Sequence, residues 1–122
     1  MLIACRGGSE DLWFFGNDDS MYGTYSGSLE ADSTYEVGLY QPNPNGLYDL
    51  YGNVMEWCLD YYNMEYDEED LVDPLDERKN ISRVIRGGGW GGSPDECRSG
   101  YRNASGEEVA TDGIGLRIVV IS

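Results

Sequence analysis

The segment from Asn43 to Tyr62, NPNGLYDLYGNVMEWCLDYY, constrains the fold of this chain more than any other. From residue 52 to 59 apolar residues alternate with the two-residue period of a strand, which predicts Glu56 on one face with Val54 and Cys58. A carboxylate half-buried among apolar side chains is costly unless a cation or several hydrogen-bond donors meet it. The sequence therefore predicts a partner for Glu56.

The composition predicts a small domain with little helix. The chain has 122 residues, and its 17 Gly and 10 Tyr lie between short apolar runs, which favours turns and short strands. It has no run of 18 apolar residues, so we expect no membrane span. We predict a single soluble domain over residues 1–122, with one small core.

The charge and the missing histidine exclude several classes of function. The chain has 23 acidic and 8 basic residues, a formal charge of -15, which disfavours nucleic acid as a partner. Such a balance fits divalent cations, cationic partners or plain solubility. Without histidine, the chain cannot form a His-based catalytic triad or a His-ligated zinc or iron site. Oxygen ligands in an acidic chain point to calcium.

The cysteines leave the cellular compartment open. Cys5, Cys58 and Cys97 form no CxxC pair, which argues against a zinc ribbon or a thioredoxin-type site. The opening MLIAC matches the end of a lipoprotein signal, but the charged and apolar regions of such a signal do not precede it. We expect no signal peptide, and either a cytoplasmic location or a place within a secreted protein.

Four runs are typical of strands, and they cover residues 47–59, 82–90, 97–102 and 114–121. The second run breaks into a triple glycine, and the fourth places Arg117 opposite an apolar face. Residues 1–45 read as loops with at most one short strand, and residues 60–77, with nine acids, read as a solvated loop. The pattern predicts a small antiparallel sheet in mostly irregular surroundings.

In this order, these pieces resemble the formylglycine-generating enzyme family, also called sulfatase-modifying factors. The matching stretches are ACRGG (4–8), FFGND (14–18), PNPNGLYDLYGNVMEWCLDYY (42–62), RVIRGGGW (83–90), CRSGYR (97–102) and IGLRIVV (114–120). The resemblance implies an α+β, mostly irregular, C-type lectin-like fold. Family domains carry a further segment before the ACRGG region, so the chain resembles their C-terminal portion. We expect an exposed apolar sheet face that a missing N-terminal segment, another partner or a second copy covers.

The chain departs from the family's pattern at the catalytic cysteines. In the family's enzymes, two cysteines shortly after the RGG motif bind copper(I) and convert a substrate cysteine to formylglycine. Counting forward, these positions fall on Gly92 and Cys97, and counting back from Arg102 both fall upstream of Cys97. Copper(I) needs two thiolates, so we predict a chain that binds no copper and is not an enzyme. The alternative is a copper-dependent oxidase. The resemblance also implies a Cys5–Cys97 disulfide, or two reduced, buried thiols in a reducing compartment.

The family also offers a partner for Glu56, because its GNxWEW segment is similar to a calcium loop. Carried onto this chain, the ligands are the carbonyls of Gly52 and Val54 and the carboxylates of Glu56 and Asp49. Two carbonyls and a carboxylate spaced by two residues can converge on one hard cation. The alternative is an ion pair between Glu56 and an arginine, for which the candidates are Arg86, Arg102 and Arg117.

The resemblance favours a binding module that displays ligand-contacting loops on this scaffold. Proteins of diversity-generating retroelements share the fold and motifs, and carry programmed variation in the corresponding loops. We predict a surface for a protein or small-molecule ligand formed by Trp90, Gly91, Gly92, Ser93, Asp95, Glu96, Tyr101, Asn103, Ser105, Glu107, Glu108, Thr111 and Asp112. We expect Trp90, Tyr101 and Arg102 to anchor a ligand, and the alternative for Trp90 is a core position.

Overall fold

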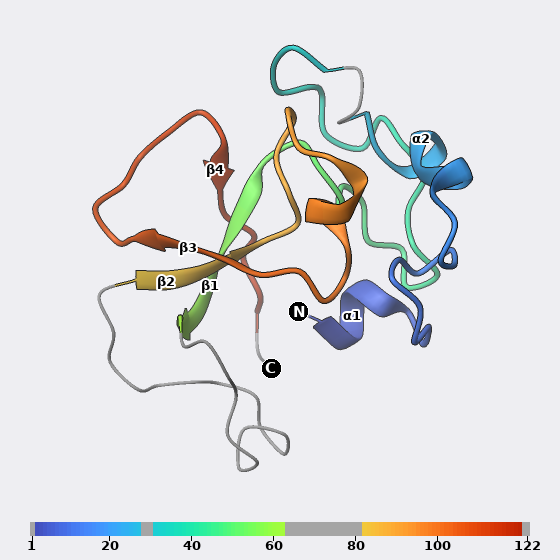
Figure 1. Cartoon of the computed structure of the whole chain (residues 1–122), viewed down its shortest axis with the longest axis horizontal. Coiled ribbons are helices and arrows are strands. Elements are labelled where there is room, and N and C mark those ends of the chain that lie inside the picture. The colour runs from blue at the N-terminus through green and yellow to red at the C-terminus, as the bar shows by residue number, and fades with distance from the viewer. Residues whose placement is uncertain (1, 28–30, 63–81, 121–122) are drawn as a thin grey trace.

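The computed structural model describes residues 2–27, 31–62 and 82–120 (Figure 1). Its helices are α1 (Leu2–Arg6), η1 (Asp19–Met21), α2 (Tyr22–Tyr25) and η3 (Pro94–Cys97), and its strands are β1 (Met55–Tyr61), β2 (Ser82–Arg86), β3 (Asn103–Gly106) and β4 (Ile114–Gly115). None of these helices is long and apolar enough to cross a membrane. The predicted acidic loop at residues 60–77 lies, from residue 63, outside the described residues.

The four strands form one sheet in the order β3-β2-β1-β4. The prediction of a small antiparallel sheet is confirmed for three strands, because β2 runs antiparallel to both β1 and β3. It is wrong for β4, which runs parallel to β1 and pairs Glu56 with Gly115. The cause is the crossover from β3 to β4, which carries the chain past two strands so that β4 runs in the direction of β3 (Figure 1).

The first predicted strand begins later than the sequence indicated. Residues 47–54 are irregular, and β1 starts at Met55 and continues to Tyr61. Asp49 and Asn53 have φ angles of 54° and 63°, in the left-handed region that breaks an extended strand. These two residues turn the chain immediately before β1, next to Glu56.

The prediction of a strand at residues 97–102 is wrong, because the helical turn η3 ends at Cys97 and the strand β3 starts only at Asn103. The turn is started by a capping box, in which the side chains of Ser93 and Glu96 bond to each other's backbone. The Nε of Arg98 donates to the carbonyl of Asp95 at 2.8 Å and closes the turn.

The apolar run from 114 to 121 forms far less strand than predicted. Only Ile114 and Gly115 pair with β1, and no strand in the described part of the chain lies beyond β4. Residues 116–120 follow as an irregular tail in which Leu116, Ile118 and Val120 are 69%, 79% and 86% exposed. Exposed apolar side chains therefore gather on this tail. In the sheet, Leu59 of β1 is 72% exposed, whereas Val84 and Ile85 of β2 are buried.

The core joins the N-terminal region to the region around η3. Its buried cluster consists of Cys5, Trp13, Tyr22, Leu50, Tyr51 and Cys97. The hydroxyl of Tyr51 accepts a hydrogen bond from the backbone N–H of Phe14 at 2.8 Å and shares another with Ser99 at 2.9 Å. The sequence predicted loops with at most one short strand over residues 1–45, and the described part of this range contains the short helices α1, η1 and α2. Aromatic rings of this region pack against the central loop. This packing brings α1 and η3 to one side of the molecule (Figure 1).

Candidate ligand-binding sites

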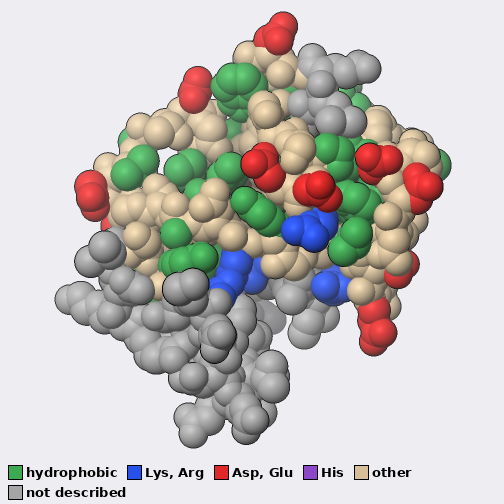
Figure 2. Space-filling view, viewed as in Figure 1, with side chains coloured by type: hydrophobic (Ala, Val, Ile, Leu, Met, Phe, Trp, Pro, Cys, Tyr) green, Lys and Arg blue, Asp and Glu red, His purple; other side chains and the backbone are tan. Residues whose placement is uncertain are grey.

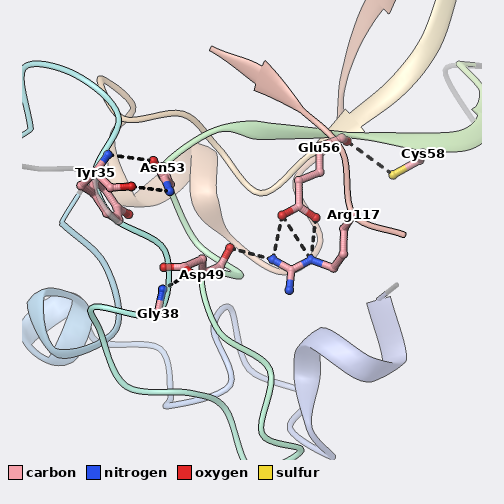
Figure 3. A network of polar contacts seen from close by, with 7 residues as sticks. All are labelled: Tyr35, Gly38, Asp49, Asn53, Glu56, Cys58 and Arg117. Atoms are coloured by element: carbon pink, nitrogen blue, oxygen red, sulfur yellow. Dashed lines mark hydrogen bonds and ion pairs between the residues drawn. The ribbon is translucent and has the colours of Figure 1, made fainter. Parts of the chain in front are cut away.

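The partner of Glu56 in the structure is Arg117 (Figure 3). The guanidinium donates from Nη2 to Glu56 Oε1 at 2.7 Å and from Nε to Oε2 at 2.9 Å, a two-pronged geometry. The side chain of Glu56 is only 12% exposed and that of Arg117 is 32% exposed. The hydrogen bonds to Glu56 raise the pKa of Arg117. The pair forms because β4 lies parallel to β1 and carries Arg117 past Glu56.

Asp49 completes this site from the loop before β1. Its backbone carbonyl accepts from Nη2 of Arg117 at 3.1 Å, and its Oδ2 accepts from the N–H of Gly38 at 2.7 Å. Its Oδ1 is buried and has no hydrogen-bond partner. Asn53 binds the same loop as Asp49 does, the one that contains Tyr35 and Gly38. Its side-chain amide exchanges two hydrogen bonds with the backbone of Tyr35 (Figure 3). The loop is thereby fixed around the Glu56–Arg117 pair.

These residues surround a hollow of about 430 Å³, which we call the paired hollow. All four predicted metal ligands line it: Asp49, Gly52, Val54 and Glu56. Its rim is apolar, because Val37, Tyr48 and Leu116 are exposed there. The structure thus brings the predicted ligand set together, and adds the cation of Arg117 to it.

The donor set of the paired hollow fits a metal ion in part. The buried, unpartnered Oδ1 of Asp49 is an oxygen that a hard cation could satisfy. The carboxylate of Glu56 is already bonded to Arg117 through both oxygens. No cluster of three or more His, Cys, Asp or Glu side chains suited to a metal occurs in the described ranges. A cation here would have to share Glu56 with a guanidinium.

The cysteines do not fit a copper(I) pair. All three are free thiols in the structure, and Cys5 and Cys97 are 3% and 0% exposed. Burial raises the pKa of Cys97 to about 11 and also raises the pKa of Cys5 and of Cys58, so the thiols stay protonated at neutral pH. A Cβ on Gly88 would stand 2.2 Å from the Cys97 sulfur, so the glycine segment after β2 packs directly on this thiol.

The predicted ligand-binding surface lies mostly at the exterior, in two separate parts. Gly91, Ser93 and Asp95 are exposed around η3, while Trp90, Gly92, Glu96 and Tyr101 are half-buried. Asn103, Glu107, Glu108, Thr111 and Asp112 are exposed, and Ser105 is half-buried. Figure 1 shows the loop after β3 and the turn η3 on opposite sides of β1. In this view the predicted residues lie in two regions, and their role as a ligand surface stays a prediction.

A second hollow, of about 400 Å³, contains one of the predicted residues, Tyr101. We call it the arginine hollow, because it is lined by Arg6, Arg98 and Arg102 together with Glu10, Asp11, Leu12, Gly100 and Tyr101. Sequence reasoning named Arg102 as a ligand anchor but missed Arg6 and Arg98. The available signal was the recurrence of arginine in ACRGG and CRSGYR within an acidic chain.

Solved structures of other proteins share the fold of this chain. The variable protein 1 of Treponema denticola superposes with a TM-score of 0.82 at 33% identity, over 94% of this chain and 42% of that chain. PvdO from Pseudomonas aeruginosa superposes with a TM-score of 0.76 at 31% identity, over 94% and 47% of the two chains. The chain is therefore an α+β protein with a C-type lectin-like fold.

The family model described as the sulfatase-modifying factor enzyme 1-like domain matches residues 1–121, and the chain belongs to this family. A serine/threonine-protein kinase pkn1 of Chlamydia pneumoniae is 37% identical over 71% of this chain and 14% of its own length. The formylglycine-generating enzyme of Streptomyces coelicolor is 34% identical over 70% of this chain and 28% of its own length. The chain thus spans less than a third of these two relatives.

Proposed function

We propose that this domain is a non-catalytic module that binds a protein or small-molecule ligand on its C-type lectin-like scaffold. The observation that carries the proposal is the state of Cys97, which is 0% exposed and whose pKa burial raises to about 11. A protonated thiol packed against backbone cannot act as a copper(I) ligand or a nucleophile without rearrangement of the core.

The alternative is a copper-dependent oxidase, which the likeness to the Streptomyces coelicolor enzyme favours. Mass spectrometry of a Cys-x-Pro-x-Arg peptide, incubated with oxygen and the copper(I)-loaded protein, separates the two. We expect no conversion of the peptide cysteine, while an active formylglycine-generating enzyme converts it under the same conditions. Conversion that is lost in Cys97→Ser would overturn the proposal.

The binding module would be a variable protein of a diversity-generating retroelement. Supporting this are the likeness to variable protein 1 of Treponema denticola and the exposure of residues 107–112. The gene neighbourhood tests this proposal. We expect a reverse transcriptase gene beside this gene, together with a near-repeat of the region that encodes residues 90–113. A neighbourhood without that repeat would leave a fixed binding surface and remove the retroelement from the proposal.

Calcium at Asp49, Gly52, Val54 and Glu56 is part of this proposal. It is supported by the buried, unpartnered Oδ1 of Asp49 and by the position of all four residues around one hollow. Binding would require Glu56 to share its carboxylate with Arg117.

A further inference from the structure

The arginine hollow collects basic side chains from segments far apart in the sequence. Arg6 ends α1, Arg98 follows η3, and Arg102 lies directly before β3. The guanidinium of Arg102 lies over the ring of Tyr62, 5.0 Å from its centroid. On the face shown in Figure 2, Lys and Arg side chains come to the surface near its centre, with Asp and Glu spread widely around them.

Two of these guanidiniums are held by main-chain carbonyls rather than by carboxylates. Nη1 of Arg6 donates to the carbonyls of Ser9 at 3.3 Å and Asp11 at 3.0 Å, and Nε of Arg98 donates to Asp95 at 2.8 Å. Within the described residues, neither Arg6 nor Arg98 forms an ion pair. A guanidinium has five N–H donors, so both terminal nitrogens of Arg98 and Nη2 of Arg6 remain available.

The charges of the side chains that line the arginine hollow favour a singly charged anion. Three arginines and the two carboxylates of Glu10 and Asp11 line it, for a net charge of about +1 by simple count. Asp11 is turned toward Asn17, whose Nδ2 donates to its Oδ1 at 2.8 Å. Glu10 is exposed. A singly charged anion matches this balance better than a phosphate dianion does.

We propose that the arginine hollow binds a carboxylate, either of a small organic acid or of a protein ligand. Planar guanidinium groups match the two oxygens of a carboxylate. Leu12 and Tyr101 offer apolar contact to the body that carries it. The inference rests on the proposed binding function and names the ligand class of one site. Its failure would show as an absence of carboxylate binding, whereas failure of the proposed function would show as peptide oxidation.

Benzoate titrated into the full chain, followed by calorimetry at low salt, tests the site. We expect saturable binding that Arg98→Gln weakens by about tenfold or more, because a hydrogen-bonded charge pair is lost. Glu10→Gln should tighten binding by about twofold to fivefold, because a repelling charge is removed. A gain of affinity cannot arise from partial unfolding.

The matched control is Arg83→Gln, which makes the same change of charge at a residue that pairs with Glu107 outside the hollow. We expect it to change the affinity by less than about twofold. Equal losses in Arg98→Gln and Arg83→Gln would overturn the proposal, because the effect would then be one of net charge. Unchanged affinity in Glu10→Gln, or no saturable binding at all, would also overturn it.

Further titrations distinguish the sources of the anion. Inorganic phosphate that binds more tightly than benzoate would overturn the assignment to a carboxylate. A short peptide with a free C-terminal carboxylate, compared with its C-terminal amide, tests a protein source. Binding of the acid and not of the amide supports a peptide carboxylate, and binding of benzoate alone supports a small organic acid.

Discussion

The two hollows are of similar size, about 430 and 400 Å³, but they hold their charges differently. In the paired hollow, the guanidinium of Arg117 is bonded to Glu56 within the protein, and the unpartnered oxygen is Oδ1 of Asp49. In the arginine hollow, Arg6 and Arg98 donate to main-chain carbonyls and keep further donors for an anion. The difference teaches that the pairing of charges, rather than their number, separates a site that stabilises the fold from one that can bind a charged ligand.

The largest expected effect is on stability at the paired hollow. Glu56→Gln leaves Arg117 without its carboxylate in a partly buried place, and we expect a loss of about 2–3 kcal/mol in the free energy of unfolding. Urea unfolding followed by tryptophan fluorescence measures it. The matched control is Glu107→Gln at the Arg83–Glu107 pair, whose carboxylate is 55% exposed, with an expected loss below about 0.5 kcal/mol. Equal losses would contradict the distinction between the two pairs.

The next effect concerns the buried thiol of Cys97, which lines neither hollow. Folding raises the pKa of Cys97 from 9.0 to about 11, so the protonated thiol is favoured in the folded state. Its contribution to stability is complete below pH 9 and is lost as the pH rises through 11. We expect this to account for on the order of 2 kcal/mol of alkaline destabilisation, and Cys97→Ser to lack that part. Unfolding curves between pH 8 and pH 11 measure it, and identical profiles for both proteins would contradict it.

A smaller effect concerns calcium at the paired hollow. With a dissociation constant of about 1 mM, typical of extracellular modules, about 5 mM calcium stabilises the fold by about 1 kcal/mol. Thermal melts with calcium and with EDTA measure this shift, and Asp49→Asn should abolish it because the buried Oδ1 becomes part of a neutral amide. Melting temperatures that calcium and EDTA leave unchanged would show that Arg117 alone neutralises Glu56.

The smallest effect is on stability at the arginine hollow. Arg98 is half-buried and donates to a main-chain carbonyl, so Arg98→Gln should lower the free energy of unfolding by about 0.5 kcal/mol. The same urea experiment measures it. A loss as large as that of Glu56→Gln would mean that Arg98 serves the fold rather than a ligand.

The need of Glu56 for a partner could be predicted from the sequence, because a single carboxylate interrupts an apolar strand. The choice of Arg117 among the candidate arginines could not. Arg117 lies 61 residues further along the chain, and only the parallel pairing of β4 with β1 brings it to Glu56. Sequence periodicity indicates the face on which a residue lies, but it does not indicate which strand lies next to it.

Other parts of the fold could not be predicted from the sequence, for different reasons. The turn η3 was signalled by the Ser93-x-x-Glu96 capping box, but the alternation after Cys97 resembles a strand. The tail at 116–120 has strong β propensity, yet it has no further strand to pair with among the described residues. The arginine hollow depends on packing between α1 and the segment after η3, which no local pattern predicts.

The most direct measurement is a benzoate titration followed through the Nε–Hε signals of arginine in a proton–nitrogen correlation spectrum. The chain contains seven arginines, so the signals can be assigned by single substitution. We predict that the signals of Arg6 and Arg98 shift saturably, because benzoate binds the terminal nitrogens that these guanidinium groups keep available. The signal of Arg117 should stay in place, because Glu56 already holds its guanidinium through both Nε and Nη2. A titration that moves Arg117 and leaves Arg6 and Arg98 unchanged would contradict the account.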